Sequence, residues 1–418
     1  MESIASSYIK GKKWFRKTID SRGKQVPQLD TFVQHVVQHD TFLQTFHSIN
    51  EETGEIEKKN MPVLDIAYPE IPKQIPSKED INMKLYKHIL ECDRETMKKN
   101  RFIFIEGEKM YQILHHVFGA KLEDFETFKD ACNNNFYDPY MPFRTLGLMR
   151  MGLDLKMGTA TRLERQPYIL TEKEGFKRVD AGKLRFFGEP EDWIMENTVF
   201  QAIVKFLAFF IYGVDTIRRY GCDPKRNFNF SSFFVRTITT PSICGEPASE
   251  GVHGDGVEYT MTMLTKSSNV DYDSGSAVTK LLSLDEELGI SAFDVNPNNV
   301  LQVIQHKKFL DTALFCDNEM YHCVTPVYQL DSEKQATRDM MLLFIRRMAK
   351  LGGEFASSLF DLETPHENFP FAMSIKDKNL SNLYPKTEIL KSGNHLLKEK
   401  PSKEDHSMTS QTEIEDQK

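Results

Sequence analysis

The sequence predicts an α+β protein whose core is a double-stranded β-helix, the barrel also called a jelly roll or cupin. Flanking helices and a mostly helical N-terminal region are expected around it. Many short strand-like runs fill the second half of the chain, separated by Gly, Asn, Asp and Pro, and such evenly spaced short strands are typical of these barrels. A long, mostly apolar helical segment at 191–220 precedes most of them and predicts a buried helix.

Three parts are expected along the chain. Residues 1–85 form an accessory region of helix and extended chain, residues 86–390 a jelly-roll domain with flanking helices, and residues 391–418 a polar, disordered tail. Within the first part, the apolar spacing over 31–46 predicts an amphipathic helix. Four prolines between 61 and 77 exclude a helix there and predict an extended linker.

The individual elements follow in order. Ser77 is expected to cap a helix that continues through Cys92. The next predicted elements are a strand at 102–105, helices at 108–118 and 122–132, and strands at 146–155, 168–170 and 177–187. The long helix at 191–220 has Asp192 as its expected cap and Gly221 as its stop. The later strands are predicted at 232–239, 258–266, 276–284, 300–304, 312–315, 322–328 and 339–347.

Composition narrows the class of protein. The 418 residues are 40% hydrophobic and 27% charged, which is normal for a soluble globular protein. A formal net charge of -8 argues against a nucleic-acid binder. The most apolar stretch, 199–214, is too short to span a membrane. Six scattered cysteines without a C-x-x-C pair favour a reducing compartment, here taken as the cytoplasm. The basic segment 3–19 leaves an organelle transit segment open, and the oligomeric state is not indicated.

A glycine-rich stretch surrounds His253 and Asp255. Gly251 and Gly256 keep the backbone permissive where a metal and its co-ligands must approach closely. The two side chains are two residues apart, so a regular strand would place them on one face. A strand-like run follows at 258–266. A strand or its edge at the mouth of a barrel can therefore offer both groups to one ion.

A second imidazole, His322, comes after a polar turn at the start of a later strand. Together with the earlier pair it gives two histidines and one carboxylate, the facial set suited to non-haem Fe(II) and O₂, with open positions for a bidentate 2-oxo acid. Arg338 begins the next strand, where its guanidinium could hold a distal carboxylate by two parallel hydrogen bonds. A surface arginine beside Asp339 is the alternative. Thr325 and Tyr259 could add hydroxyl contacts to the co-substrate.

These motifs, in this order, resemble the isoleucine-dioxygenase-like group of Fe(II)- and 2-oxoglutarate-dependent dioxygenases, which hydroxylate free amino acids. That group shows P-E-G-x-H-x-D-G-x-x-Y, then N-[IV]-x-x-G-x-[ST], then D-[DN]-x-x-x-H-x-V-T-P and an R-D before the last strand. This chain reads S-E-G-V-H-G-D-G-V-E-Y at 249–259 and continues with Asn269-Val270, Gly275-Ser276, the run 317–326 and Arg338-Asp339. Its departures, Ser249 for proline and Gly254 for a basic residue, lie outside the iron positions.

The resemblance implies a set of roles. Iron ligation falls to His253, Asp255 and His322, and anchoring of 2-oxoglutarate falls to Arg338. The implied reaction oxidises an sp3 C–H bond of a free amino acid or amino-acid derivative by hydroxylation, with O₂ as oxidant and release of succinate and CO₂. A place in secondary metabolism is expected.

The substrate is less well defined by the sequence. Arg236, Glu250 and Arg144 are candidates for binding charged groups of an amino-acid-like molecule, and a structural salt bridge is equally open for each. Oxidative ring closure of an N-alkylated glutamate derivative, as in the algal kainoid synthases, is a second hypothesis, because a substrate with several carboxylates would use extra arginines. A metal-binding cupin scaffold without catalysis and a protein-modifying oxygenase are the alternatives from other classes.

Overall fold

The computed structural model describes residues 46–49, 56–59, 78–138, 140–167, 169, 182–217, 221–223, 225–352 and 361–376. The chain divides into two compact units, Met1–Ile81 and Asn82–Lys418. In the first unit, β1 (Phe46–Ile49) and β2 (Ile56–Lys59) form an antiparallel pair. The predicted helix at 31–46 lies outside the described residues except for Phe46, which starts β1. The predicted linker and polar tail also lie outside them, and the three-part division remains a prediction.

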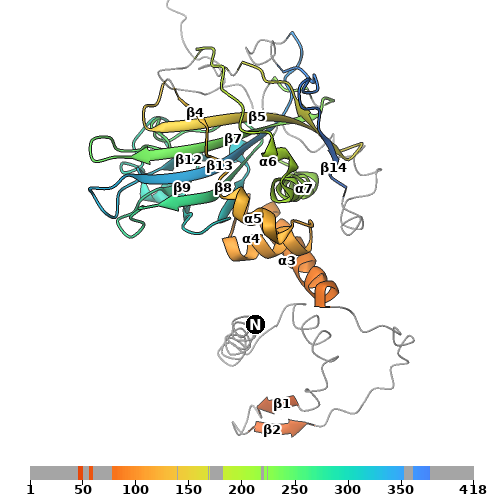
Figure 1. Cartoon of the computed structure of the whole chain (residues 1–418). Coiled ribbons are helices and arrows are strands. Elements are labelled where there is room, and N and C mark those ends of the chain that lie inside the picture. The colour runs from red at the N-terminus through yellow and green to blue at the C-terminus, as the bar shows by residue number, and fades with distance from the viewer. Residues whose placement is uncertain are drawn as a thin grey trace, which may run out of the picture. The chain divides into compact units, whose positions relative to one another are not determined.

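The second unit is built on two antiparallel sheets, and the predicted jelly-roll class is confirmed (Figure 1). The larger sheet has the order β14-β6-β5-β7-β13-β8-β11-β3, with β4 paired to β5, and the smaller has the order β10-β9-β12. The strands of the larger sheet are β3 (Phe102–Ile105), β4 (Phe136–Tyr137), β5 (Arg144–Asp154), β6 (Thr159–Leu163), β7 (Phe228–Thr239), β8 (Tyr259–Ser268), β11 (Thr312–Phe315), β13 (Ala336–Arg347) and β14 (Ala372–Ser374). Those of the smaller sheet are β9 (Val278–Leu282), β10 (Val300–Gln305) and β12 (Tyr321–Val324).

Helices cover one face of the larger sheet, as Figure 1 shows. They are α3 (Lys78–Asn100), α4 (Gly107–His116), α5 (Leu122–Phe128), α6 (Trp193–Glu196) and α7 (Thr198–Gly213). The predicted single helix at 191–220 is in fact two, because the chain turns out of helical geometry at Asn197. The side chain of Asn197 accepts a hydrogen bond from the Val199 backbone at 2.9 Å and caps α7. Among the described residues, no helix is both long and apolar enough to cross a membrane.

The alternation of side chains along the central strands separates the helix face from the barrel interior. In β7, Phe234 packs with the helices, whereas Phe233 and Val235 point to the interior. In β13, Leu343 joins the helix face, and Leu342 faces the interior. Both faces are buried here, so the alternation between these positions is not visible as a change between polar and apolar residues.

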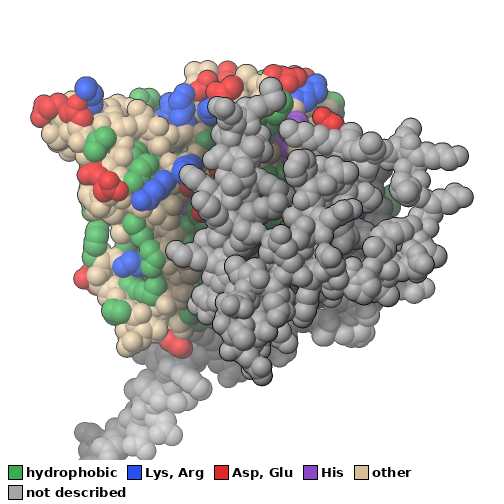
Figure 2. All heavy atoms as spheres, turned by 90° about the horizontal axis from the view of Figure 1, so that it is seen from below, with side chains coloured by type: hydrophobic (Ala, Val, Ile, Leu, Met, Phe, Trp, Pro, Cys, Tyr) green, Lys and Arg blue, Asp and Glu red, His purple; other side chains and the backbone are tan. Residues whose placement is uncertain are grey.

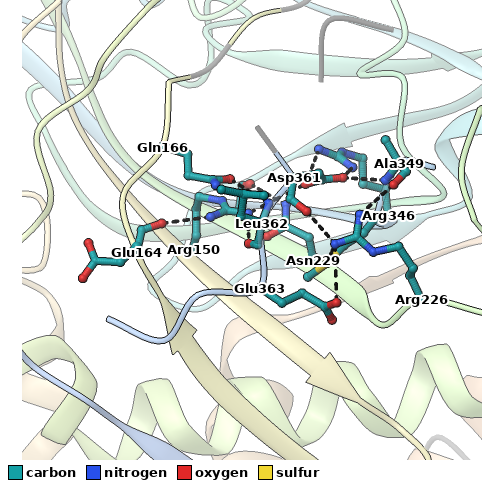
Figure 3. Close-up of polar contacts among 12 residues, drawn as sticks. Arg150, Glu164, Gln166, Arg226, Asn229, Arg346, Ala349, Asp361, Leu362 and Glu363 are labelled. Atoms are coloured by element: carbon teal, nitrogen blue, oxygen red, sulfur yellow. Dashed lines mark hydrogen bonds and ion pairs between the residues drawn. The ribbon is translucent and has the colours of Figure 1, made fainter. Parts of the chain in front are cut away.

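A short C-terminal segment, 361–376, is fastened to the barrel by a buried ion cluster (Figure 3). Asp361 is 2% exposed, pairs with Arg346 and accepts the Ala349 backbone N–H at 2.6 Å. Arg150 donates to the carbonyl of Leu362 at 3.3 Å and lies 3.7 Å from the Asp361 carboxylate. The segment is therefore tied to both β5 and β13, two strands that also form the interior wall.

On the face seen in Figure 2, acidic and basic side chains of the described part are interspersed among apolar ones. Such mixed charge is normal for a surface that does not bind a polyanion.

Candidate active site

The interior of the barrel holds a cavity of about 140 Å³ between the two sheets. Its walls come from β5, β7, β8 and β13 of the larger sheet and from β9 and β12 of the smaller one. Its apolar part includes Leu146, Phe187, Phe233 and Val235. The polar side chains of the predicted site gather around the same space, so the cavity is the candidate active site.

His253 and His322 lie opposite each other and form an isolated antiparallel β-bridge. The backbone N–H of each donates to the carbonyl of the other, at 2.9 and 2.8 Å, and the ring centroids are 4.2 Å apart. Asp255 follows in the loop that enters β8. Its Oδ1 lies 3.7 Å from Nε2 of His253, and its Oδ2 lies 3.5 Å from Nε2 of His322. One ligand atom from each residue lies within 4.8 Å of the others, and the three predicted ligands therefore converge.

The backbone conformation of this loop explains why Gly251 is a glycine. Gly251 has a φ of +74°, and a Cβ on it would lie 2.2 Å from the carbonyl oxygen of Ile290. A larger residue could not occupy this position without moving the loop. The carbonyl of Gly251 in turn accepts from Nδ1 of His253 at 2.9 Å. Because a carbonyl only accepts, this bond places the proton on Nδ1 and leaves Nε2 free as a ligand.

Burial shapes the protonation of the cluster. Burial and the neighbouring His253 hold the pKa of His322 well below its usual value, so its ring is neutral near pH 7. Burial raises the pKa of Asp255, and the nearby His253 partly opposes this shift. A neutral imidazole is the form that binds metal. Two imidazole nitrogens and one carboxylate match the donor set of non-haem Fe(II) sites, so the residues fit that ion.

Arg338 lies in the same cavity and is 3% exposed. It makes no side-chain hydrogen bond or ion pair with another described residue, and its Nε has no partner. Burial lowers the pKa of Arg338 to about 10, and the nearby hydroxyl of Tyr272 opposes the shift. A buried cation without an anion is costly, and the arrangement fits an acidic ligand that enters the cavity.

Two further polar atoms near Arg338 also lack partners. The hydroxyl of Tyr272 and Nδ1 of His306 are buried and make no hydrogen bond with the described residues. Nε2 of His306 lies 3.1 Å from the hydroxyl of Thr262. Burial and the charge of Arg338 lower the pKa of His306 to about 3, so this ring is neutral. The sequence reasoning missed both residues. Tyr272 lies inside the quoted Asn269–Ser276 turn, whereas His306 has no motif to mark it.

Of the residues proposed to bind charged substrate groups, Arg144 and Glu250 do line the cavity. Arg144 also donates to the Asp138 carboxylate at 2.9 Å. Glu250 lies 3.7 Å from Nε2 of His253, beside the metal ligands. Arg185 lines the cavity as well and is 5% exposed. It was missed because it lies at the end of a segment predicted only as a strand, without a motif.

Three predicted contacts are wrong, and strand geometry gives the reason for two of them. Tyr259 faces the helix side of β8, where its hydroxyl donates to the Val214 carbonyl. Arg236 faces away from the cavity on β7 and forms a bidentate pair with Asp339 at 2.7 and 2.6 Å. The hydroxyl of Thr325 is used by backbone groups, since it donates to a carbonyl at 2.7 Å and accepts an N–H at 2.8 Å. None of the three lines the cavity.

The match to known proteins agrees with this site. The family described as 2OG-Fe dioxygenase matches residues 129–344, more than half of the chain. The chain is also similar to the solved Fe(II)/(alpha)ketoglutarate-dependent dioxygenase TqaL, at 33% identity and a TM-score of 0.59, over 70% of this chain and 97% of that one. The chain therefore belongs to the 2OG-Fe dioxygenase family. This family is defined by its use of Fe(II), 2-oxoglutarate and O₂.

Two other similar proteins give less information about this chain. The bifunctional enzyme flvA of Aspergillus flavus is 35% identical over 334 residues, which are 77% of this chain. The chain spans only 40% of the length of flvA. A bsmA homolog from Methylobium petroleophilum is 15% identical with a TM-score of 0.50, over 64% of this chain and 95% of that one. At that identity the likeness shows the fold alone.

Proposed function

We propose that His253, Asp255 and His322 hold the Fe(II), that Arg338 anchors 2-oxoglutarate, and that the substrate is an amino acid or amino-acid derivative of secondary metabolism. The observation that carries the substrate class is the number of charged groups in one cavity. Beyond the groups assigned to iron and co-substrate, it is lined by Arg144, Arg185 and Glu250.

The reaction follows from this assignment. Fe(II) bound there would let O₂ decarboxylate 2-oxoglutarate to succinate and CO₂ and oxidise an sp3 C–H bond of the substrate. Arg338 would contribute two parallel donors to the distal carboxylate of 2-oxoglutarate, and the nearby hydroxyl of Tyr272, which has no partner among the described residues, would add a third. This carboxylate would neutralise the buried charge of Arg338. Binding of the co-substrate would therefore offset the desolvation cost of the unpaired guanidinium.

Opposite charges in the cavity would orient the substrate. Glu250 lies close to the metal ligands and suits an ammonium group, whereas Arg144 and Arg185 suit carboxylates. The wall formed by Phe187 and Phe233 suits an alkyl chain. A molecule held at its charged end would present a C–H bond of its apolar part to the metal, and that placement selects which bond reacts.

This substrate class is tested by incubating the purified chain with Fe(II), ascorbate, O₂, 2-oxoglutarate and two panels, amino acids and matched amines without carboxylates. Succinate should form in step with a substrate product only in the amino-acid panel. Arg185→Met should raise the KM of the productive substrate about 10-fold, as expected for a lost charged hydrogen bond. Equal turnover of the amines would contradict the assignment.

Ring closure of an N-alkylated glutamate-type substrate is a second candidate, in the manner of the kainoid synthases. It is favoured by the presence of two arginines beyond Arg338 in the cavity, because one amino-acid carboxylate needs only one of them. Mass spectrometry of the product separates the two reactions. Gain of one oxygen means hydroxylation of the kind expected for an isoleucine-dioxygenase-like enzyme, and loss of two hydrogens means ring closure or desaturation.

The location in the cell is also a proposal. All six cysteines are free thiols, which suits a reducing compartment such as the cytoplasm. Fractionation of cells that express the tagged full chain would test it, and recovery in an organelle would favour the transit segment instead.

A further inference from the structure

Asp317 is a buried carboxylate next to the candidate iron site. It lies in a short 3-10 turn, Asp317–Glu319, between β11 and β12, and it is 3% exposed. Its side chain does not contact a cation among the described lysines and arginines. Instead it faces two of the three residues that form the candidate iron site.

The first contact is with the loop that carries Asp255. Oδ1 of Asp317 accepts the backbone N–H of Asp255 at 3.1 Å, and Oδ2 accepts that of Val257 at 3.3 Å. One carboxylate thereby spans the loop on both sides of Gly256, which has a φ of +70°. The position of the Asp255 side chain depends on the loop that these two bonds hold.

The second contact is with His322. Nδ1 of its ring lies 3.7 Å from Oδ1 of Asp317 and has no hydrogen-bond partner among the described residues. The other nitrogen, Nε2, points to Asp255 at 3.5 Å. For Nε2 to bind a metal, Nδ1 must carry the proton. A ring shift of about 0.5–1 Å would bring Nδ1–H within hydrogen-bond distance of Asp317.

We propose that Asp317 is a positioning residue for the iron site, which fixes the tautomer and orientation of His322 and the loop that carries Asp255. The inference rests on the proposed function, because it takes His322 and Asp255 as metal ligands. Groups that orient metal-bound histidines from behind typically change metal affinity by about 10–100-fold. Asp317 contacts both the loop that carries Asp255 and the ring of His322.

The test is a titration of the purified full chain with Co(II) in place of Fe(II), followed by calorimetry and by the visible absorption of the bound ion. Asp317→Asn should weaken Co(II) binding by about 10–100-fold and alter the absorption spectrum. Asp311→Asn is the matched control. Asp311 is also an aspartate, is 5% exposed, and accepts backbone N–H groups of Gly107 and Lys307 at 2.7 and 2.8 Å, but it does not line the site. It should leave Co(II) affinity unchanged.

A measurement on the unaltered chain covers the case in which Asp317→Asn does not fold. With Co(II) bound, proton NMR should show an exchangeable Nδ1–H for His322, displaced by the paramagnetic ion and protected from solvent. Metal-bound Nδ1 or an unprotected proton would overturn the proposal, as would wild-type affinity in Asp317→Asn. If the wild type binds Co(II) no better than His253→Ala, the proposed iron site itself fails, and the inference fails with it.

Discussion

Arg338 is a buried cation whose guanidinium has no anionic partner among the described residues. Arg236, on the neighbouring strand, is the opposite case, since Asp339 meets it with two hydrogen bonds. The two arginines were both candidates for binding at the site. Only the one without a partner lines the cavity. At the scale of single residues, the lack of an anionic partner is the observation that supports Arg338, and not Arg236, as the proposed anchor of 2-oxoglutarate.

Arg338→Met should raise the concentration of 2-oxoglutarate needed for half-maximal turnover by at least about 10-fold, equivalent to about 1.4 kcal/mol, because the charged hydrogen bonds are lost. Initial rates of succinate formation against 2-oxoglutarate concentration would measure this change. Arg236→Met serves as the control, and it should lower the unfolding temperature while leaving the 2-oxoglutarate requirement unchanged. Equal requirements in Arg338→Met and wild type would show that Arg338 does not anchor the co-substrate.

Glu250→Gln should raise the KM for an amino-acid substrate about 10-fold, since an ammonium loses its charged partner. Turnover of 2-oxoglutarate in the absence of substrate should change much less, because Glu250 is not assigned to iron or co-substrate. Both quantities come from succinate measurements with and without substrate. Glu250 lies 3.7 Å from Nε2 of His253. A proportional loss of both quantities would therefore assign Glu250 to the metal site instead.

The proposed ligands could be predicted from the sequence, and some of their neighbours could not. His253, Asp255, His322 and Arg338 were predicted from spacing and order, because metal and carboxylate chemistry restricts the residue types. Tyr259 was misassigned because its hydroxyl suggested a polar contact, whereas it alternates with Thr260 and lies with Met261 on the helix side of β8. Residues such as His306 and Arg185 come to the cavity through tertiary packing alone, and no local pattern marks them.

At the scale of elements, the presence of a strand was easier to predict than the residues at which helices and strands begin and end. The strand at 312–315 has the predicted bounds, and β12 ends at Val324, earlier than predicted. The break between α6 and α7 was missed because the apolar pattern continues across it, whereas the Asn197 cap is a local hydrogen bond. The strand predicted at 177–187 lies partly outside the described residues, and residues 182–187 form no strand.

The cluster around Asp361 should stabilise the barrel strongly. Asp361→Asn leaves Arg346 and Arg150 buried without their carboxylate, and breaking such a pair costs about 3–5 kcal/mol of unfolding free energy. Chemical denaturation would measure the loss. Glu363→Gln is the control, because Glu363 pairs with Arg226 at the surface with 41% of its side chain exposed, and it should cost little. Similar losses in both variants would contradict a central role for Asp361.

The same carboxylate predicts a dependence of stability on pH. Burial alone would raise the pKa of Asp361, but Arg346 and the Ala349 N–H outweigh it and hold the pKa below its usual value. The stabilising contribution is therefore complete above the unfolded pKa of about 3.9 and is lost as the pH falls through the lower folded value. In denaturation between pH 6 and 2, wild type should lose stability relative to Asp361→Asn only at the acid end.

At the scale of the whole molecule, the two-sheet barrel brings together groups that are far apart in the sequence. The antiparallel order places the 253–255 loop beside β12, so that His253 and His322 share backbone hydrogen bonds. The helices on the outer face of the larger sheet support it without entering the cavity. The fold class was predictable from the spacing of short strands. The pairing of particular strands was not, because it depends on contacts between distant segments.

The central claim is that His253, Asp255 and His322 hold one Fe(II) to which 2-oxoglutarate also binds. The most direct measurement adds Fe(II) and 2-oxoglutarate to the purified chain without oxygen and records the visible charge-transfer absorption of the ternary complex. Wild type should develop this band with one Fe(II) per chain, and His322→Ala should not, although it remains folded by circular dichroism. A band of full strength in His322→Ala, or no band in wild type, would contradict the assignment of the iron site.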